Sequence, residues 1–527
     1  MKDYGSCTRE EALIEGMGPA WWAAQLPSGT KAAISPWGDR TWSELNANAN
    51  RMARLMRGAG LQPGDSAAAC VRNRPQMMEF YYACLRSGIR YTPVNWHLNE
   101  EEAGYVIDNC EAKAVLMEGS DAAMAKAAVT RAPRLRLKLS VGGDIDGFTR
   151  LEAALADMDP ENLKDPVRGN SMLYTSGTTG RPKGVWKKDR APEIGVSRLS
   201  ASLDFNPLTD RVLMTGPSYH SAPLGFNMLI PMTKGVGVVM MDKWDAEDTL
   251  KLIEEHKVTH THLVATMFHR MLHLPDEVKQ RYDTGSLRHI LHGAAPTPVH
   301  VKKGIIDWFG PIVYEYYAGT EGSGGFFIDS EEWLKKPGSV GTSDKGAEDV
   351  LLLDEDGDKV KQGDVGTLYF RRPETGSFEY YKDPAKTART YRGDYFTLGD
   401  MGYLDEDGYL FLTGRSAETI ISGGVNIYPQ EIDERLLQHD AVQDVCTIGV
   451  PNEEWGEEVK SVIQLKTGVK AGDKLRDDIL AFAAGGLARF KVPRSIDFTT
   501  DLPRMPSGKI QRQKVRGPYW AGRDRSI

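Results

Sequence analysis

A polar segment at positions 174–184 concentrates groups that can bind phosphate. It reads YTSGTTGRPKG and carries four Ser or Thr hydroxyls, three glycines and two cations. Glycine lets the backbone approach an anion closely, while hydroxyls and a lysine supply hydrogen bonds and positive charge. A flexible linker would need neither the Pro-Lys pair between glycines nor the apolar strand expected directly before the segment. It is not a Walker A motif, because the Gly-x-x-x-x-Gly-Lys-Ser/Thr order is absent. The expected triphosphate ligands are Thr175, Ser176, Gly177, Thr178, Thr179, Gly180 and Lys183.

A second segment, EYYAGTE at 315–321, follows an apolar strand expected at 312–314. Thr320 offers a hydroxyl to a phosphate oxygen. Glu321 offers a carboxylate to Mg²⁺, a hard cation that prefers oxygen ligands. A solvated surface pair is the alternative, although an aromatic platform precedes these two residues.

Two further sites place charged residues around a run of strands and turns and on a glycine-flanked loop. Asp400 and Arg415 offer an acceptor and a donor, which together suit a diol; a salt bridge at a domain junction is the alternative. Lys509 lies in PSGKI, residues 506–510, where the neighbouring glycine would let a lysine enter a closed site. An ordinary surface lysine is the alternative there.

Length and composition indicate a protein of at least two domains. A chain of 527 residues exceeds the size at which one hydrophobic core keeps growing. Apolar residues at 41% and charged residues at 26% are typical of globular proteins. The formal charge of -8 provides no general basic field for nucleic acid or anionic lipid. The longest apolar stretch, 228–241, is interrupted by Lys234 and two glycines, so we interpret it as core strands and not as a membrane span.

Strands and helices alternate in the first part of the chain. Thr41 and Glu44 have capping-box spacing before a helical pattern that ends near Gly58. Strand–helix–strand order predicts a parallel sheet. We expect strands at 66–71, 91–94, 114–117, 137–141 and 172–175, and helices at 75–85 and 121–127.

The character of the sequence changes after about residue 415. We expect helices at 429–438 and 475–484 and strands at 442–450 and 459–465. The fold class is therefore α/β: a large N-terminal domain of parallel and mixed sheets with helices, residues 1–414, and a small mobile α+β C-terminal domain, residues 415–527.

The polar segments together resemble the signatures of the adenylate-forming superfamily, which includes acyl-CoA synthetases, peptide-synthetase adenylation domains and luciferases. The resemblance runs from Trp42 to Lys509. It implies that the phosphate loop binds ATP, that Thr178 and Glu321 hold Mg²⁺, and that Asp400 and Arg415 contact the ribose. Lys509 would bridge the substrate carboxylate and the α-phosphate while negative charge moves onto pyrophosphate. The implied catalytic residues are Lys509, Thr320, Glu321 and His220.

The resemblance also implies an adenine site. HGAAP, residues 292–296, is similar to the family turn that borders adenine, and its small side chains leave room for a flat ring; a tight structural turn is the alternative. Tyr317 would stack beside the base. The implied nucleotide contacts are Gly293, Ala294, Ala295, Glu315, Tyr316, Tyr317, Ala318, Gly319 and Thr320.

GPSYH, residues 216–220, resembles the family's acyl-pocket motif, with His220 between the carboxylate and the nucleotide. A lone histidine is more often a hydrogen-bonded core residue. The expected pocket residues are Tyr219, His220, Phe226, Gly293, Gly319 and Gly324. Many glycines near the carbonyl indicate a long or broad channel. We favour a bulky apolar acid, such as a long-chain fatty acid or a steroid side-chain acid, and leave an aromatic acid open.

The C-terminal segments resemble the acyl-CoA synthetase branch. In ETIISGGVNIYP, residues 418–429, two glycines would border a pantetheine tunnel. Segments 449–456 and 488–494 also resemble that branch, although a core tryptophan and a solvated basic face are the alternative. The implied coenzyme A contacts are Gly423, Gly424, Trp455, Phe490, Lys491 and Arg494.

The reaction expected has two steps. A carboxylate attacks the α-phosphate of ATP to give acyl-AMP, and the thiolate of coenzyme A then attacks the acyl carbonyl after the C-terminal domain rotates. Ala417 departs from the Asp or Lys that the family often has at its hinge, which puts a role for a hinge side chain in doubt.

A ligase that loads a carrier protein is the alternative function, and a light-emitting oxygenase is a more remote one. A non-catalytic nucleotide-binding protein is disfavoured by the joint presence of Lys183, Glu321, Asp400, Arg415 and Lys509.

Remaining features refine this interpretation. His260 and His262 could ligate a metal from one strand face, but no cysteine or carboxylate cluster supports such a site. Five scattered cysteines predict free thiols.

Residues 1–11 lack the apolar region of a secretory signal, so a cytoplasmic location is expected, with no transmembrane segment. The expected partners are a small carboxylic acid, ATP and coenzyme A, without nucleic acid; a homodimer is left open.

Overall fold

The computed structural model describes residues 2–175, 182–188, 198–294, 297–322, 324–343, 346, 349–354, 356–373, 377–415, 418–422, 425–452, 455–505 and 508–521. Several residues singled out in the sequence lie outside these ranges, namely Ser176, Gly177, Thr178, Thr179, Gly180, Ala295, Ala417, Gly423 and Gly424.

The chain starts with two short helices and then builds a parallel sheet with helices on it. The strand order is β7-β6-β5-β3-β4-β8, and every pairing is parallel. Its strands are β3 (Ser66–Cys70), β4 (Arg90–Pro93), β5 (Ala112–Glu118), β6 (Leu137–Val141), β7 (Thr149–Arg150) and β8 (Asn170–Ser171). The helices are α1 (Arg9–Ile14), α2 (Gly18–Gln25), α3 (Trp42–Gly58), α4 (Pro75–Leu85), α5 (Glu100–Asn109), α6 (Ala122–Arg131) and α7 (Leu151–Leu155). The predicted alternation is confirmed.

Local sequence explains where the main helices begin. The Thr41 hydroxyl accepts a hydrogen bond from the Glu44 backbone at 3.2 Å, and the Glu44 carboxylate accepts one from the Thr41 backbone at 2.8 Å. The predicted capping box is thus confirmed at the start of α3. Pro75 occupies the first turn of α4, where its missing N–H costs no hydrogen bond.

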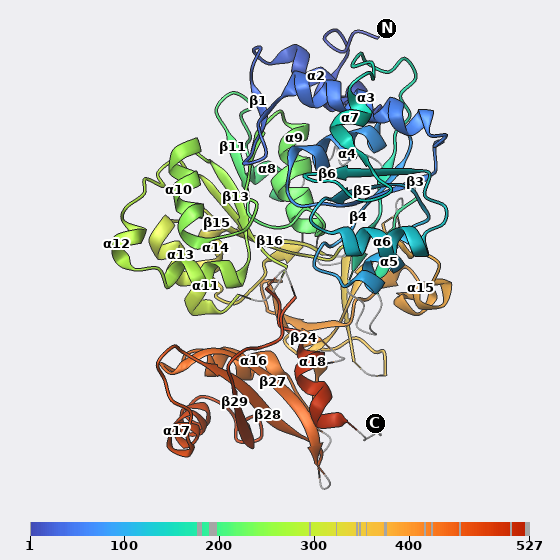
Figure 1. Cartoon of the computed structure of the whole chain (residues 1–527). Helices are drawn as coiled ribbons and strands as arrows, with labels where there is room; N and C mark the ends of the chain where they lie inside the picture. The colour runs from blue at the N-terminus through green and yellow to red at the C-terminus, as the bar shows by residue number, and fades with distance from the viewer. Residues whose placement is uncertain are drawn as a thin grey trace.

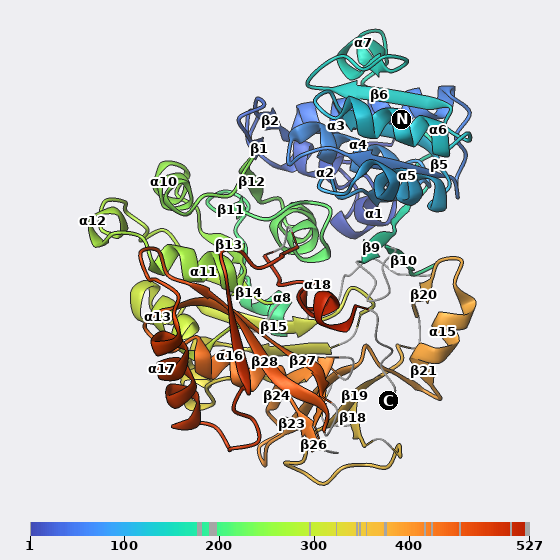
Figure 2. The ribbon, with the colours of Figure 1, turned by 60° about the horizontal axis from the view of Figure 1, so that its bottom comes forward.

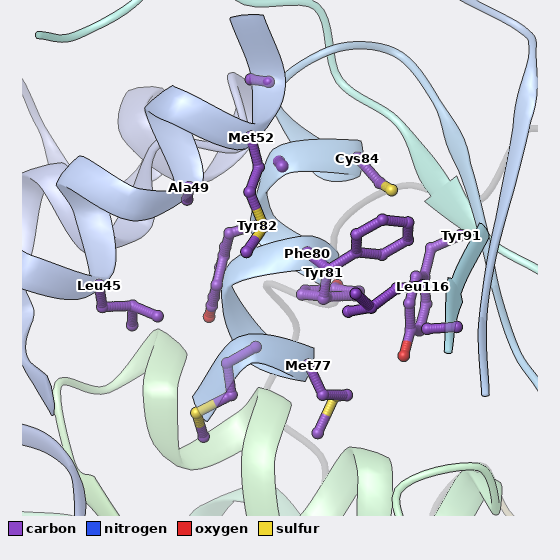
Figure 3. Close-up of a cluster of buried hydrophobic side chains, with 14 of the residues drawn as sticks. Leu45, Ala49, Met52, Met77, Phe80, Tyr81, Tyr82, Cys84, Tyr91 and Leu116 are labelled. Atoms are coloured by element: carbon purple, nitrogen blue, oxygen red, sulfur yellow. The ribbon is translucent and has the colours of Figure 1, made fainter. Parts of the chain in front are cut away.

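The core of this part lies between α3, α4 and the sheet (Figure 3). Leu45 and Met52 of α3 are buried with Phe80 of α4, and Tyr91 and Leu116 come from the strands beneath. Burial of each such side chain contributes about 1.5–3 kcal/mol. The two helices thus share one core with the strands β4 and β5.

A nine-stranded sheet follows, in the order β17-β16-β15-β14-β13-β11-β12-β1-β2. Its central pairings are parallel, and antiparallel strands close both edges. The strands are β1 (Lys31–Ile34), β2 (Arg40–Thr41), β11 (Arg211–Met214), β12 (Gly237–Met240), β13 (His260–Leu263), β14 (His289–His292), β15 (Val313–Ala318), β16 (Gly324–Ile328) and β17 (Thr342–Ser343). The helices of this part are α8 (Arg198–Ser202), α10 (Ala246–His256), α11 (Ala265–Leu272), α12 (Asp276–Lys279), α13 (Val299–Phe309) and α14 (Ser330–Lys335).

The interpretation of 228–241 as core strands is wrong for its first half. Residues Pro223–Leu229 form the π-helix η1, Ile230–Thr233 continue as α9, and only β12 is a strand. An apolar run does not distinguish a buried helix from a buried strand by periodicity. Pro231 in the first turn of α9 and Gly235 with φ 76° set the true boundaries.

The motif 315–321 also differs from expectation. The strand predicted to end at residue 314 continues through Ala318 as β15, because Glu315, Tyr316 and Tyr317 pair with β16. Only Gly319, Thr320 and Glu321 belong to the turn.

Two smaller sheets complete the part of the chain before the C-terminal domain. The hairpin β9 (Leu173–Thr175) and β10 (Lys183–Trp186) pairs with β20 (Glu379–Tyr380), which precedes α15 (Pro384–Thr390). The other sheet is antiparallel and consists of β18 (Val350–Leu353), β19 (Gly366–Arg371), β21 (Tyr391–Arg392), β22 (Tyr395–Phe396), β23 (Asp400–Leu404) and β24 (Leu410–Arg415).

The small C-terminal domain lies below the N-terminal domain, beyond β24 (Figure 1). Its sheet consists of β25 (Ile420–Ser422), β26 (Val425–Ile427), β27 (Val442–Asn452), β28 (Gly456–Leu465) and β29 (Ser495–Thr499). Its helices are α16 (Pro429–Leu436), α17 (Asp473–Ala484) and α18 (Arg512–Arg516), followed by the 3₁₀-helix η4 (Gly517–Trp520). The division at residues 414 and 415 remains a prediction. No helix within the described ranges is long and apolar enough to cross a membrane.

Candidate active site

A cavity of about 2910 Å³ is lined by both domains. Thr320 and Glu321 enter it from the turn after β15, and Asp400 and Arg415 enter it from β23 and β24. Lys509 of the C-terminal domain lines the same cavity. Figure 2 shows the C-terminal domain in front of β15. Residues predicted from segments far apart in the sequence are therefore brought to one place.

The phosphate segment forms the β9–β10 hairpin. Thr175 ends β9 and lies opposite Lys183, the first residue of β10. Thr175 and Pro182 line the cavity. The residues between them, 176–181, lie outside the described ranges. The hairpin thus places both of its described candidate ligands at the base of one loop beside the cavity.

The turn after β15 is held by two side chains that the sequence did not indicate as site residues. The Ser221 and Thr320 hydroxyls lie 3.1 Å apart in a hydrogen bond. Tyr380 donates from its hydroxyl to Glu321 Oε1 at 3.0 Å. Ser221 follows His220 directly and could have been found there, whereas only the pairing of β20 with β10 brings Tyr380 to Glu321.

Asp400 and Arg415 face each other because β23 pairs with β24 in that register. Arg415 Nε donates to Asp400 Oδ1 at 2.7 Å, and the Tyr317 hydroxyl donates to Asp400 Oδ2 at 2.6 Å. Burial, with Asp400 beside it, raises the pKa of Tyr317 well above its usual value. Burial alone would lower the pKa of Arg415, but Asp400 raises it, so the guanidinium stays charged. The ion pair expected as the alternative is present, and it orients both polar groups at the cavity wall.

Lys509 lies on a loop that approaches the N-terminal domain closely. The Met505 backbone donates to the Lys509 carbonyl at 2.7 Å, and Arg504 donates to the Gly508 carbonyl at 2.8 Å. Gly508 has φ 83°, and a Cβ there would collide with the Thr266 side chain of α11, so the close approach requires glycine. Burial and the charge of Arg415 lower the pKa of Lys509.

The residues expected around adenine lie at the ends of β14 and β15. A Cβ on Gly293 would lie 2.6 Å from the Tyr316 carbonyl oxygen, which explains the glycine. Ala294 adopts a φ of 66°. The Glu315 carboxylate is held by Lys302 of α13 at 2.6 Å, and burial raises the pKa of this glutamate although Lys302 opposes the shift. Gly293, Ala294 and the residues from Glu315 to Thr320 line the cavity.

The predicted acyl-pocket residues come from several elements: Phe226 lies on η1, Tyr219 and His220 lie in the turn before the helix, Gly293 and Gly319 follow β14 and β15, and Gly324 starts β16. His220 Nε2 is buried and has no hydrogen-bond partner among the described residues. Burial, together with His97, lowers the pKa of His220 to about 4, so the imidazole is neutral at physiological pH. Tyr219 packs edge-on against Trp96 at 4.5 Å between ring centres. The His220 ring therefore presents an unsatisfied nitrogen at the cavity wall and is not a fully hydrogen-bonded core residue.

Phe226 forms part of a small aromatic group in the same wall. Its ring centre lies 4.6 Å from that of Tyr316 and 5.8 Å from that of His262. His262 in turn bonds the Tyr316 hydroxyl at 3.1 Å, while His260 bonds the Leu203 carbonyl at 2.6 Å. Each histidine of this pair thus has an ordinary hydrogen-bond partner. The described part of the chain contains no group of three or more His, Cys, Asp or Glu that could hold a metal ion.

Four of the expected coenzyme A contacts, Trp455, Phe490, Lys491 and Arg494, are described, and all belong to the C-terminal domain. Trp455 is 42% exposed and Phe490 is 51% exposed, so the alternative that places Trp455 in a core is wrong. The Arg494 guanidinium carbon lies 5.9 Å from the Trp455 ring centre, and Lys491 pairs with Glu431 at 2.6 Å. The cavity lining described for this domain orientation contains none of these four residues.

The five cysteines are free thiols, as predicted. Four of them are buried, and Cys7 is half-buried. Disulfides therefore contribute nothing to the arrangement of the cavity walls.

Both parts of the chain match models of a known protein family. Residues 20–381 match the family model of the AMP-binding enzyme, and residues 431–509 match that of the AMP-binding enzyme C-terminal domain. A long-chain-fatty-acid–CoA ligase of Bacillus subtilis is 30% identical, with 94% of this chain and 92% of the relative covered. A feruloyl-CoA synthase of Amycolatopsis is 32% identical, with 90% and 93% covered.

Solved structures agree with the sequence comparison. ATP-bound MatB from Rhodopseudomonas palustris superimposes with a TM-score of 0.81 at 28% identity, with 96% of this chain and 99% of that chain covered. The chain therefore belongs to the AMP-binding enzyme family, in its acid–CoA ligase branch.

Proposed function

We propose that this AMP-forming acid–CoA ligase activates a bulky apolar carboxylic acid, with a long-chain fatty acid as the leading class. The observation that carries the catalytic assignment is the single cavity that joins Lys509 of the C-terminal domain to Thr320, Glu321, Asp400 and Arg415 of the N-terminal domain. These groups come from four separate segments, and their convergence suits an adenylation site.

The first step needs charge stabilisation more than proton transfer. Lys509 would lie between the substrate carboxylate and the α-phosphate, where an ammonium offsets the negative charge that moves onto pyrophosphate. Thr320 would donate to an α-phosphate oxygen, since its hydroxyl is oriented by Ser221. The proposed roles of Thr175 and Lys183 are contacts to the β- and γ-phosphates.

Glu321 fits a magnesium ion that is shared with the nucleotide. Mg²⁺ in such sites is held by one or two carboxylates plus substrate phosphates, so a cluster of three protein ligands is not required. Tyr380 fixes the carboxylate by bonding one of its oxygens. When bound, the ion would neutralise phosphate charge; Thr178, which lies outside the described ranges, is the second proposed ligand.

The nucleoside would be held by two polar and one aromatic contact. Asp400 and Arg415 would bind the ribose hydroxyls from adjacent strands, which suits a diol because one group accepts and the other donates. Tyr317 would lie beside adenine, with its hydroxyl anchored on Asp400.

The second step requires a different domain orientation. Trp455 and Arg494 lie on the outside of the C-terminal domain, away from the cavity that Lys509 lines. Rotation of this domain would withdraw Lys509 and present these residues, with Phe490 and Lys491, to coenzyme A. The orientation described here suits adenylation.

The helical segment 221–233 supports an extended acyl site. Its residues Leu224, Phe226, Leu229, Ile230 and Thr233 all line the cavity. A helical segment of this length extends about 20 Å at roughly 1.5 Å per residue. Apolar lining over such a length favours a long acid, although the similarity to a feruloyl-CoA synthase keeps an aromatic acid as the alternative.

A panel of acids tests the proposal. Saturated fatty acids of increasing length, a steroid side-chain acid and ferulate are each incubated with ATP, and pyrophosphate release is measured with and without coenzyme A. We expect release with the long apolar acids and thioester only when coenzyme A is present. Activity confined to ferulate supports the aromatic alternative, and thioester formed only on a phosphopantetheinylated carrier protein supports the carrier-loading alternative.

A further inference from the structure

Lys386 is a charged residue of the cavity wall outside the motifs that identify the site. It lies in the first turn of α15, where the Asp383 carboxylate accepts a hydrogen bond from its backbone N–H at 3.0 Å. Its Nζ lies 4.6 Å from the centre of the Tyr380 ring. The residue lines the cavity.

Strand pairing brings this lysine to the phosphate hairpin. β20 pairs with β10 so that Tyr380 lies opposite Val185, and α15 therefore starts next to the strand that begins with Lys183. Lys183 is among the groups that lower the pKa of Lys386, so the two side chains lie close to each other. Two ammonium groups placed close together repel.

The phenol of Tyr380 and the carboxylate of Glu321 lie next to Lys386. Tyr380, over which Lys386 lies, donates to the Glu321 carboxylate at 3.0 Å. The pair of lysines is therefore beside the proposed metal ligand, at the end of the cavity where phosphates are expected. A polyanion placed there would screen the repulsion between the lysines.

The charges around Lys386 come from three elements. Burial is the main cause that lowers the pKa of Lys386 to about 8; Lys183 of β10 adds to the shift, whereas Asp383 and Glu321 oppose it. Near pH 8 the side chain is therefore only partly protonated in the free protein. An anion in contact with it favours the charged form.

We propose that Lys386, together with Lys183, binds the β- and γ-phosphates of ATP and holds pyrophosphate as it leaves. The inference rests on the proposed function. In the adenylation step a carboxylate oxygen bonds to the α-phosphorus while the bond from that phosphorus to the bridging oxygen breaks. The electron pair leaves with pyrophosphate and no proton is transferred, so the ammonium acts by electrostatic stabilisation.

Binding of inorganic pyrophosphate without turnover tests the inference directly. Calorimetric titrations in the presence of Mg²⁺ compare the wild type with Lys386→Ala, Lys386→Arg and Lys382→Ala. Lys382 is a matched control because it lies on the same segment but pairs with Glu111 at 3.3 Å. We expect Kd to rise by roughly tenfold or more in Lys386→Ala, since a charge-assisted hydrogen bond is lost. Lys386→Arg should restore much of the affinity, and Lys382→Ala should match the wild type.

Proton uptake provides a second readout. At about pH 8.5, titrations in buffers of different ionisation enthalpy should show that the wild type takes up part of a proton on binding pyrophosphate, and that Lys386→Ala loses this uptake. Equal affinity and equal uptake in the two proteins would overturn the inference, as would a wild type that binds no pyrophosphate. If Lys386→Ala does not fold, Lys386→Gln keeps the side-chain length and is judged by the same outcomes.

These titrations need no acid substrate. A failure of the proposed function would instead appear as absence of acid-dependent pyrophosphate release by the wild type. The two failures are therefore distinguishable.

Discussion

Gln443 of the C-terminal domain and His269 of the N-terminal domain are joined by a hydrogen bond of 2.8 Å between their side-chain nitrogens. Gln443 lies on β27 and His269 lies on α11, so the bond spans the interface between the domains. Burial, with His273 beside it, lowers the pKa of His269 to about 4, which leaves a neutral ring that can accept from the amide. The bond helps to define the orientation in which Lys509 lines the cavity.

Gln443→Ala should therefore slow adenylation selectively. Loss of one such hydrogen bond costs about 0.5–1.5 kcal/mol, so the rate of acyl-AMP formation should fall by up to roughly tenfold. Thioester formation from supplied acyl-AMP should not fall, because it uses the other orientation. Single-turnover assays of each half-reaction measure both rates, with Gln438→Ala as a control on the exposed surface of the same domain. An equal loss in both half-reactions would contradict this role.

Lys509→Ala should lower acyl-AMP formation by about 10²-fold or more, the usual scale for loss of one electrostatic stabiliser. Conversion of synthetic acyl-AMP to the thioester should persist. Lys470→Ala, an exposed lysine of the same domain, is the control. If the variant fails as badly with acyl-AMP as with ATP, Lys509 is structural or acts in both steps.

Glu321→Gln should weaken the response to Mg²⁺ more than the binding of the acid, because it removes ligand charge and leaves the acyl wall intact. Activity is titrated against Mg²⁺ at saturating ATP. Tyr380→Phe is the matched variant: it removes the 3.0 Å hydrogen bond to Glu321 but keeps the carboxylate charge, so its Mg²⁺ requirement should change less. An unchanged Mg²⁺ dependence in Glu321→Gln would remove this residue from the metal site.

The N-terminal α/β alternation could be predicted because local signals agreed with the fold. The Thr41–Glu44 capping box and the apolar strands β3 and β6 needed no tertiary information. The strand predicted over residues 228–233 is wrong because apolar residues there fit either a buried helix or a buried strand.

The missed site residues depend on contacts between distant parts of the chain. Tyr380 reaches Glu321 only through the β10–β20 pairing, and Gln443 reaches His269 only through docking of the two domains. No periodicity or composition marks such residues, since each occupies an ordinary position in its own segment. Ser221 is different, because its place beside His220 was a usable signal.

Trp455→Ala should raise the KM for coenzyme A by roughly three- to tenfold, the scale of one aromatic contact, and leave the KM for ATP unchanged. The exposed indole has Arg494 beside it, which suits an adenine or pantetheine surface. Leu334→Ala, an exposed apolar residue of the N-terminal domain, is the control. Equal effects on coenzyme A and ATP would indicate a structural role for Trp455.

His262 should make the N-terminal domain sensitive to acid. The side chain is 2% exposed, and burial lowers its pKa to about 4, compared with about 6.5 in an unfolded chain. The unfolded state therefore binds the proton first, so this contribution to stability is complete above about pH 6.5 and is lost as the pH falls toward 4. The difference is at most about 3 kcal/mol for one histidine.

His262→Gln isolates this contribution, because glutamine can still bond the Tyr316 hydroxyl but does not titrate in this range. We expect the variant to be less stable than the wild type at neutral pH and to lose less stability on acidification. Urea unfolding followed by circular dichroism between about pH 5 and pH 7.5 measures this, with each transition of the two domains fitted separately. The wild-type advantage should shrink by up to about 1.4 kcal/mol per pH unit below pH 6. Parallel curves for the two proteins would show that His262 is not the titrating group, and the acid sensitivity would then be traced to other buried histidines such as His292.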